Sequence, residues 1–121
     1  MRKSTLLKEE EYLDRWYEYA KEIHKYCLAK EKLYIYGAGF FGEKALTIME
    51  NIGVHVKGIV VSDGFRDRDS LNGVEIFELS EIDLEDKDLG IVIAAFDAHG
   101  LRQQMQKNLE DKGYYGYLVL H

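Results

Sequence analysis

The chain has 121 residues, of which 46% are hydrophobic and 31% charged, and its formal net charge is −6. This size and composition predict one soluble globular domain with a single ordinary core. The acidic balance argues against nucleic-acid binding, which requires a basic face. Because the chain contains one cysteine, an internal disulfide and a cysteine-based metal site are excluded.

Apolar runs in the sequence are short, and none reaches the length needed to cross a bilayer. The opening residues, MRKSTLLKEEE, lack the apolar segment of a signal peptide. We therefore expect no membrane insertion. Together with the cysteine usage, these features predict a cytoplasmic location.

Residues 4–30 have the apolar periodicity of one long amphipathic helix. We accordingly divide the chain into an N-terminal amphipathic helix, residues 1–30, and a domain, residues 31–121. The apolar stripe must be buried on the sheet of that domain or on another chain, so residues 6–27 can hold a homodimer or a partner catalytic domain. The stripe consists of Leu6, Leu13, Trp16, Ala20, Ile23 and Cys27.

The same helix twice matches the Tyr-x-x-x-Lys spacing of short-chain dehydrogenases, at Tyr17–Lys21 and at Tyr26–Lys30. That spacing places both side chains on one helix face, where a lysine lowers the pKa of a tyrosine. In those enzymes, however, the pair follows the glycine turn, whereas here it precedes it. We interpret these residues as packed tyrosines and solvated lysines.

The most informative segment is KLYIYGAGFFG, residues 32–42, in which an apolar run ends in three closely spaced glycines and leads into a helical pattern. In a strand, glycine turn and helix, each glycine has its own role. Gly37 makes the tight turn, Gly39 lets a ligand phosphate approach the backbone, and Gly42 lets the helix pack against the strand. The helix start offers unpaired N–H groups to an anion.

This turn predicts the phosphate-binding element of a Rossmann-like domain. The alternative is a plain strand-to-helix turn that needs glycine for its geometry and binds nothing. The candidate binding residues of the turn are Gly37, Ala38, Gly39, Phe40, Phe41 and Gly42.

A second predicted strand, residues 54–61, is followed by an acid where a dinucleotide fold places its ribose-binding carboxylate, roughly 20 residues after the glycine turn. Asp63 occupies that position, and it also fits an ordinary turn before Gly64. Arg66 and Arg68 follow within a few residues. They could meet a 2′-phosphate or a diphosphate, or be solvated in a loop.

The remaining pattern predicts strands at residues 73–77, 89–96 and 117–120, and a helix between residues 101 and 113. The result is an α/β fold: a Rossmann-like three-layer sandwich with a mostly parallel sheet of about five strands and the extra N-terminal helix. Residues 75–88 are rich in acids, and we interpret them as a solvated surface.

Ligands of such sheets bind at the carboxyl ends of the strands, where the strand order reverses. The third loop expected there, residues 96–100, adds Phe96 and Asp97 to the candidate cofactor-binding residues. His99 could serve as a general base or be merely exposed. No serine lies in a nucleophile elbow and no lysine follows the glycines as in a P-loop, so no catalytic residue is assigned and enzymatic activity stays open.

Taken in order, several segments resemble a family of small Rossmann-like domains: YIYGAGFFG, VKGIVVSDG, LNGVEIFELSEI, LGIVIAAF and LEDKGYYGYLVL. Such domains are found at the front of nucleotide-sugar dehydratases and epimerases of bacterial polysaccharide synthesis. Similar domains front sugar O-acyltransferases and accompany glycosyltransferases. The resemblance covers residues 32–120, and the pairing of GVEIF with LSEI is its most distinctive part.

The resemblance implies binding of NAD or a nucleotide-sugar at Gly37, Gly39, Gly42 and Asp63. The partner domain that performs chemistry in those enzymes is absent from this sequence. A nucleotide-binding module of polysaccharide or glycosyl-transfer machinery is thus the leading hypothesis. The alternatives are a non-binding structural or oligomerisation module and a small NAD-dependent oxidoreductase or epimerase fragment.

Overall fold

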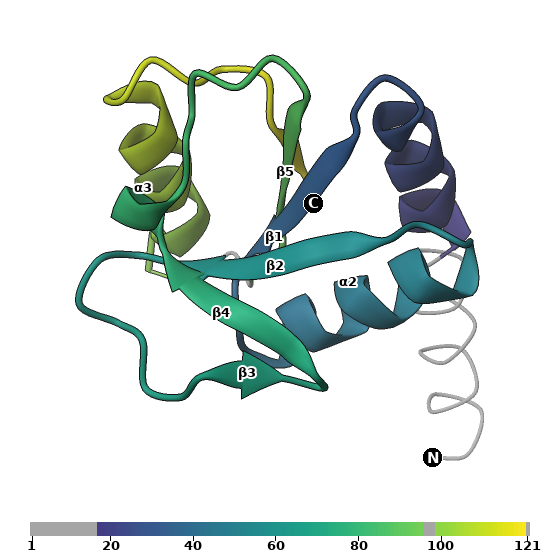
Figure 1. Cartoon of the computed structure of the whole chain (residues 1–121), viewed down its shortest axis with the longest axis horizontal. Coiled ribbons are helices and arrows are strands. Elements are labelled where there is room, and N and C mark those ends of the chain that lie inside the picture. Colours follow the sequence, from purple (N-terminus) through teal and green to yellow (C-terminus); the bar gives the residue numbers. More distant parts are fainter. Residues whose placement is uncertain (1–16, 96–98, 121) are drawn as a thin grey trace.

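The computed structural model describes residues 17–95 and 99–120, and a six-stranded sheet lies at its centre in the order β3-β4-β2-β1-β5-β6 (Figure 1). All neighbouring strands are parallel except β3 and β4. The strands are β1 (Lys32–Tyr36), β2 (Val56–Val61), β3 (Ser70–Leu71), β4 (Val74–Glu78), β5 (Leu89–Ile93) and β6 (Leu118–Val119).

The predicted α/β class and mostly parallel sheet are confirmed. The sheet has one strand more than the five expected, because β3 pairs antiparallel with β4 within residues 63–73, whose polar composition is typical of a loop. Ser70 and Leu71 form a strand because they pair with β4, and the composition of a segment does not indicate which strand it will pair with.

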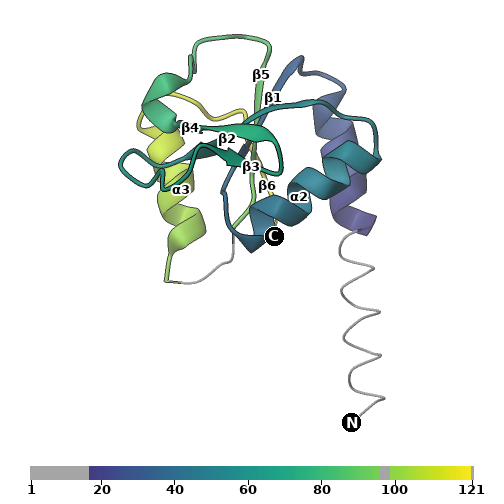
Figure 2. The same cartoon turned by 60° about the horizontal axis from the view of Figure 1, so that its bottom comes forward.

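Helices cover both faces of the sheet (Figures 1 and 2). Residues 17–27 are helical and pack with α2 (Phe40–Asn51) on one face, called here the two-helix face. On the opposite face, called the α3 face, lie α3 (Leu101–Glu110) and the short 3₁₀ helix η1 (Leu79–Glu81). The part of the predicted N-terminal helix before residue 17 lies outside the described residues.

Side chains of β1 alternate between two separate apolar cores. Leu33 and Ile35 join the core of the two-helix face, whereas Tyr34 and Tyr36 join the core of the α3 face. Tyr19 and Ile23 are buried in the first of these cores, so the described part of the N-terminal apolar stripe packs on the sheet of its own chain. The homodimer or partner-domain contact expected through residues 6–27 stays a prediction.

The strand order reverses at β1. The chain leaves β1 through α2 and builds β2 and β4 on one side, then returns through η1 to build β5 on the other side of β1. Parallel pairing aligns the carboxyl ends of β1, β2 and β5 along the same edge of the sheet. This edge is where ligands bind in open α/β sheets.

Two tyrosines complete the other flank of β5, where the short strand β6 pairs only with Val92 and Ile93. The Tyr26 hydroxyl accepts a hydrogen bond of 3.0 Å from the Ile91 N–H, and the Tyr114 hydroxyl donates one of 3.0 Å to the Leu89 carbonyl. Burial raises the pKa of both phenols. Tyr26 thus has a packing role.

No helix in the described part of the chain is long and apolar enough to span a membrane.

Candidate functional site

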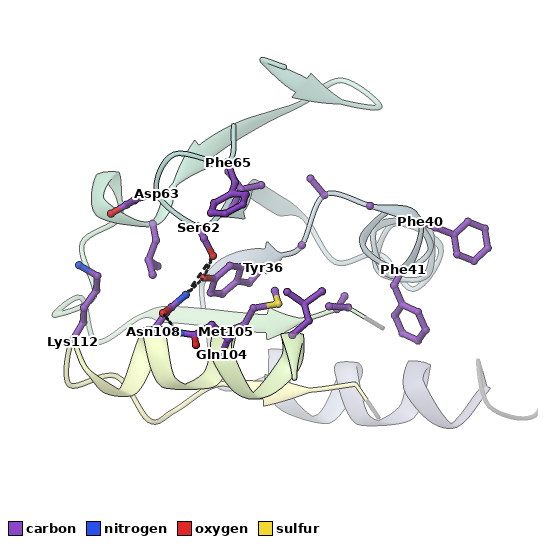
Figure 3. Close-up of a pocket in the computed structure, with 18 of the residues that line it drawn as sticks. Tyr36, Phe40, Phe41, Ser62, Asp63, Phe65, Gln104, Met105, Asn108 and Lys112 are labelled. Carbon is purple, nitrogen blue, oxygen red and sulfur yellow. Dashed lines mark hydrogen bonds between the residues drawn. The ribbon is translucent and has the colours of Figure 1, made fainter. Parts of the chain in front are cut away.

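A cleft of about 830 Å³ opens at the carboxyl ends of β1, β2 and β5 and extends along α3 (Figure 3). Its floor is formed by the ends of the three strands, and α3 supplies one wall. The loop after β2 supplies another wall. The cleft therefore lies at the reversal point of the sheet, on the α3 face.

Gly37 closes the turn that leaves β1. Its φ of +134° lies in the region that side chains rarely adopt, and a Cβ there would stand 2.2 Å from the Ala94 carbonyl oxygen. The Gly37 N–H donates to the Val60 carbonyl over 2.9 Å, and the Ala94 N–H donates to the Tyr36 carbonyl over 3.0 Å. Hydrogen bonds thus hold the turn to both neighbouring strands.

The fold requires the absence of a side chain at Gly42 but not at Gly39. A Cβ on Gly42 would stand 2.0 Å from the Gly37 carbonyl oxygen, so the first turn of α2 packs on the glycine turn itself rather than on a strand. Gly39 is the N-cap of α2 with a φ of −87°, and a Cβ there would meet none of the described residues within 4 Å. The protein's own geometry does not demand glycine at Gly39, and the space beside it is open.

The start of α2 faces this open space without a side-chain cap from Gly39. An α-helix leaves its first N–H groups without partners inside the helix and carries a partial positive charge there. The Arg68 guanidinium donates a 2.6 Å hydrogen bond to the Ala38 carbonyl, which brings a positive side chain to the glycine turn. Of the two arginines considered from the sequence, Arg68 is the one at this turn.

Asp63 and Arg66 both have partners within the chain, and their contact with a ligand stays a prediction. Asp63 lines the cleft, but one oxygen of its carboxylate accepts a 2.9 Å hydrogen bond from the Ser80 N–H, and Figure 3 shows the carboxylate turned away from Tyr36. Arg66 is not among the lining residues. Its guanidinium pairs with Glu81 over 2.8 Å and with Glu78 over 3.7 Å.

The third predicted loop is described only in part. Phe96 and Asp97 lie outside the described residues, whereas Ala94 and Ala95, which come directly before them, line the cleft. His99 is exposed, has a φ of +52° and does not line the cleft.

A polar cluster inside the cleft was not anticipated from the sequence. The Tyr36 and Ser62 hydroxyls are 2.6 Å apart, and the Asn108 amide nitrogen lies 3.1 Å from the first and 3.4 Å from the second (Figure 3). Gln104 donates a 2.9 Å hydrogen bond to the Asn108 amide oxygen. The sequence feature that indicates part of this cluster is the i, i+4 pair of amides Gln104 and Asn108, which lies beside the buried Met105 on α3.

Apolar side chains form much of the remaining lining. Phe65 lines the cleft although the residue is 76% exposed, and the lining residues Leu101 and Phe40 are also exposed. Asp111 and Lys112 bring one charge of each sign to the far end of α3. An apolar cavity with a few convergent polar groups is typical of small-molecule sites.

The described lining of the cleft offers hydrogen-bonding groups, apolar surface and charges of both signs. Its described lining contains backbone groups, hydroxyls, amides, two aspartates and one lysine, and it includes no histidine, cysteine or glutamate. Over the residues that the structure covers, no group of three or more His, Cys, Asp or Glu could hold a metal ion. Among the described lining residues, no nucleophile and base pair is assembled.

No protein-family model matches the chain, and no curated protein matches it. The class that the fold and the cleft define is therefore an α/β protein with a mostly parallel sheet and a ligand-sized cleft at its carboxyl edge. The resemblance to polysaccharide-biosynthesis domains stays a prediction from short motifs.

Proposed function

We propose that this chain is a Rossmann-like nucleotide-binding module that holds NAD or a nucleotide-sugar in the cleft. The observation that carries the proposal is the position of the glycine turn, which lines a cleft at the point where the strand order reverses. In a doubly wound sheet this point is the usual site of nucleotide binding. We also propose the corresponding architecture, a three-layer sandwich with helices outside both faces.

The phosphate groups would lie against Gly39 and the first turn of α2. The open space beside Gly39 lets an oxygen approach the backbone, and the helix N-terminus favours negative charge. Arg68, held at the Ala38 carbonyl, adds a positive charge next to the same turn. An acidic protein can bind an anionic nucleotide through such local groups, despite its net charge of −6.

The remaining cleft is large enough for the rest of a nucleotide. Its volume of about 830 Å³ falls within the range of roughly 300–1,000 Å³ that small-molecule sites occupy. Because its described lining lacks a catalytic pair, we propose that chemistry is supplied by a partner. The module would then serve as an accessory part of polysaccharide biosynthesis or of glycosyl-transfer machinery in a bacterial cytoplasm.

Isothermal titration calorimetry with NAD(H), UDP-sugars and coenzyme A tests this proposal. We expect at least one nucleotide to bind at micromolar to millimolar concentration. The absence of binding by every one of them at millimolar concentration would refute the proposal.

The variant Gly39→Asp separates binding from folding. Aspartate is a favourable N-cap, and a Cβ at this position meets nothing, so the helix should stay intact. Its carboxylate would occupy the proposed phosphate position and repel the ligand, and we expect binding at least tenfold weaker with no loss in Tm. The control Thr47→Asp adds the same charge on an exposed position of α2 and should leave binding unchanged.

A further inference from the structure

Three polar side chains from distant parts of the sequence meet in the wall of the cleft: Tyr36 at the end of β1, Ser62 after β2, and Asn108 on α3. Tyr36 is 1% exposed, although it lies at the edge of a cavity. Its ring fills the core of the α3 face, and its hydroxyl reaches the other two side chains (Figure 3). A hydroxyl buried this deeply needs a partner for its proton.

The hydrogen bonds of this cluster use all but one of its hydroxyl protons. The Asn108 NH₂ group donates to both hydroxyls, because its amide oxygen is already an acceptor for Gln104. Tyr36 and Ser62 share a single hydrogen bond between them, so only one of their two protons is used there. The other hydroxyl proton remains available to an acceptor from outside the cluster.

Burial decides which proton is left over. If Ser62 donated to Tyr36, the phenol proton would be buried without any acceptor seen in the described residues, which is unfavourable. If Tyr36 donates to Ser62, the phenol is satisfied and the Ser62 oxygen accepts from both Tyr36 and Asn108. Ser62 is only half-buried and lines the cleft, so its proton can face the cavity.

Phe65 supplies a flat apolar surface beside this donor. Phe65 lines the same cleft, yet the residue is 76% exposed, so the described part of the chain leaves its side chain largely uncovered. In Figure 3 the ring lies on one side of Ser62 and Tyr36, and the side chains of α3 lie on the other. Aromatic rings in such positions stack on planar heterocycles such as nucleotide bases.

We propose that Ser62 and Phe65 form the base subsite of the nucleotide and that the Ser62 hydroxyl donates to an oxo group on the pairing edge of the base. This inference rests on the proposed nucleotide-binding function and narrows it. Bases such as uracil and hypoxanthine present an oxygen acceptor where cytosine and adenine present an amino donor. The Ser62 oxygen has no lone pair left to accept a hydrogen bond from an amino group, because it already accepts two hydrogen bonds.

Two matched pairs of nucleotides test the subsite: UDP against CDP, and IDP against ADP. Each pair exchanges an oxo group for an amino group on the pairing edge. We expect the oxo nucleotide of each pair to bind about fivefold or more tightly, since one hydrogen bond is worth about 1 kcal/mol and the amino group also meets a donor. Calorimetric titration of the whole chain gives the four affinities.

The variant Ser62→Ala should reduce the oxo-to-amino ratio to about one. Ser62→Thr, which keeps the hydroxyl, should restore the preference. The control Ser80→Ala removes an exposed hydroxyl outside the cleft and should leave the ratio at the wild-type value. Phe65→Ala should weaken all four nucleotides while the affinity for inorganic pyrophosphate stays the same.

The outcomes distinguish this inference from the proposed function. If none of the four nucleotides binds, and NAD(H) and UDP-sugars also fail, the nucleotide-binding function is wrong. If nucleotides bind to the wild type with equal oxo and amino affinities, or if Ser62→Ala keeps the preference, the base subsite is wrong while the function stands. The wild-type ratio alone is decisive if the Ser62 variants do not fold.

Discussion

The two faces of the sheet are covered differently. The two-helix face is closed by α2 and by residues 17–27, and its core includes side chains such as Ile23, Met49 and Ile59 that are fully buried. The α3 face is covered by one full helix and a single 3₁₀ turn, and the cleft occupies the space beside them. One face thus contributes packing, and the other leaves room for a ligand.

The difference shows how a small domain combines a closed core on one face with an open cleft on the other. Apolar burial contributes free energy in rough proportion to the area removed from water, so a face closed by two helices supplies much of the stability. A cleft lowers that contribution where it opens, because its lining side chains keep contact with water. The glycine turn connects β1 to α2, which covers the two-helix face, and Gly37, Ala38 and Gly39 of the turn also line the cleft on the α3 face.

The largest loss is expected from Gly42→Ala, which breaks the two-helix face where α2 begins. The added Cβ would stand 2.0 Å from the Gly37 carbonyl oxygen, and backbone cannot yield as a flexible side chain can. We expect the free energy of unfolding to fall by about 3–4 kcal/mol. Urea denaturation measures it. The control Gly39→Ala, with open space around its Cβ, should cost about 1 kcal/mol or less, and equal losses would contradict this account.

Truncating one buried side chain on each face of the sheet should lower the free energy of unfolding by different amounts. Ile23 is 0% exposed under the closed face, so Ile23→Ala should lower the free energy of unfolding by about 3 kcal/mol. Met105 is 4% exposed but lines the cleft, so the volume freed by Met105→Ala joins an existing cavity. We expect a loss of about 1–2 kcal/mol there. A larger loss at Met105 than at Ile23 would reverse the assignment of the faces.

Tyr26→Phe tests how the two faces are joined at the flank of β5. The variant removes the hydroxyl that accepts from the Ile91 N–H and contacts the Tyr114 hydroxyl at 3.3 Å. A backbone donor would lose its partner, and we expect about 1–2 kcal/mol of destabilisation at neutral pH. Tyr17→Phe is the matched control, because its ring is exposed, and it should leave the urea midpoint unchanged.

The smallest effect concerns pH. Burial raises the pKa of the Cys27 thiol from 9.0 to about 11, and burial also raises the pKa of Tyr26. Below pH 9 both groups are neutral in the folded and unfolded chain. Above it the unfolded chain ionises first, so stability should fall as the pH rises from 9 through 11. Urea midpoints from pH 7 to 11 measure the fall, and Cys27→Ala should make it shallower. A fall of the same size in Cys27→Ala would exclude the thiol as a source.

Much of the fold followed from the sequence by itself. The strand, glycine turn and helix at residues 32–42 were readable because Gly37 and Gly42 are required by the local backbone path. The buried run at residues 89–93 was readable because a strand covered on both faces is continuously apolar. The positive φ of Gly37 is a local backbone feature, and burial of β5 on both faces leaves a continuous run of apolar residues, so the residue types record both features.

The site depended on contacts that no local pattern records. Asp63 stands at the expected distance from the glycine turn, yet its carboxylate bonds to Ser80. Arg68 reaches the Ala38 carbonyl, whereas Arg66, two residues earlier, pairs with acids of β4 and η1. The direction of each side chain is set by partners at a distance along the chain, so sequence spacing alone could not choose between them.

The sequence alone determined the α/β class, the place of the glycine turn and the edge of the sheet at which the cleft opens, because these follow from local backbone requirements and apolar periodicity. Only the tertiary structure brought Tyr36, Ser62 and Asn108 into one cluster. The three residues come from separate elements, and only the packing of α3 on the sheet places their polar atoms within hydrogen-bond distance.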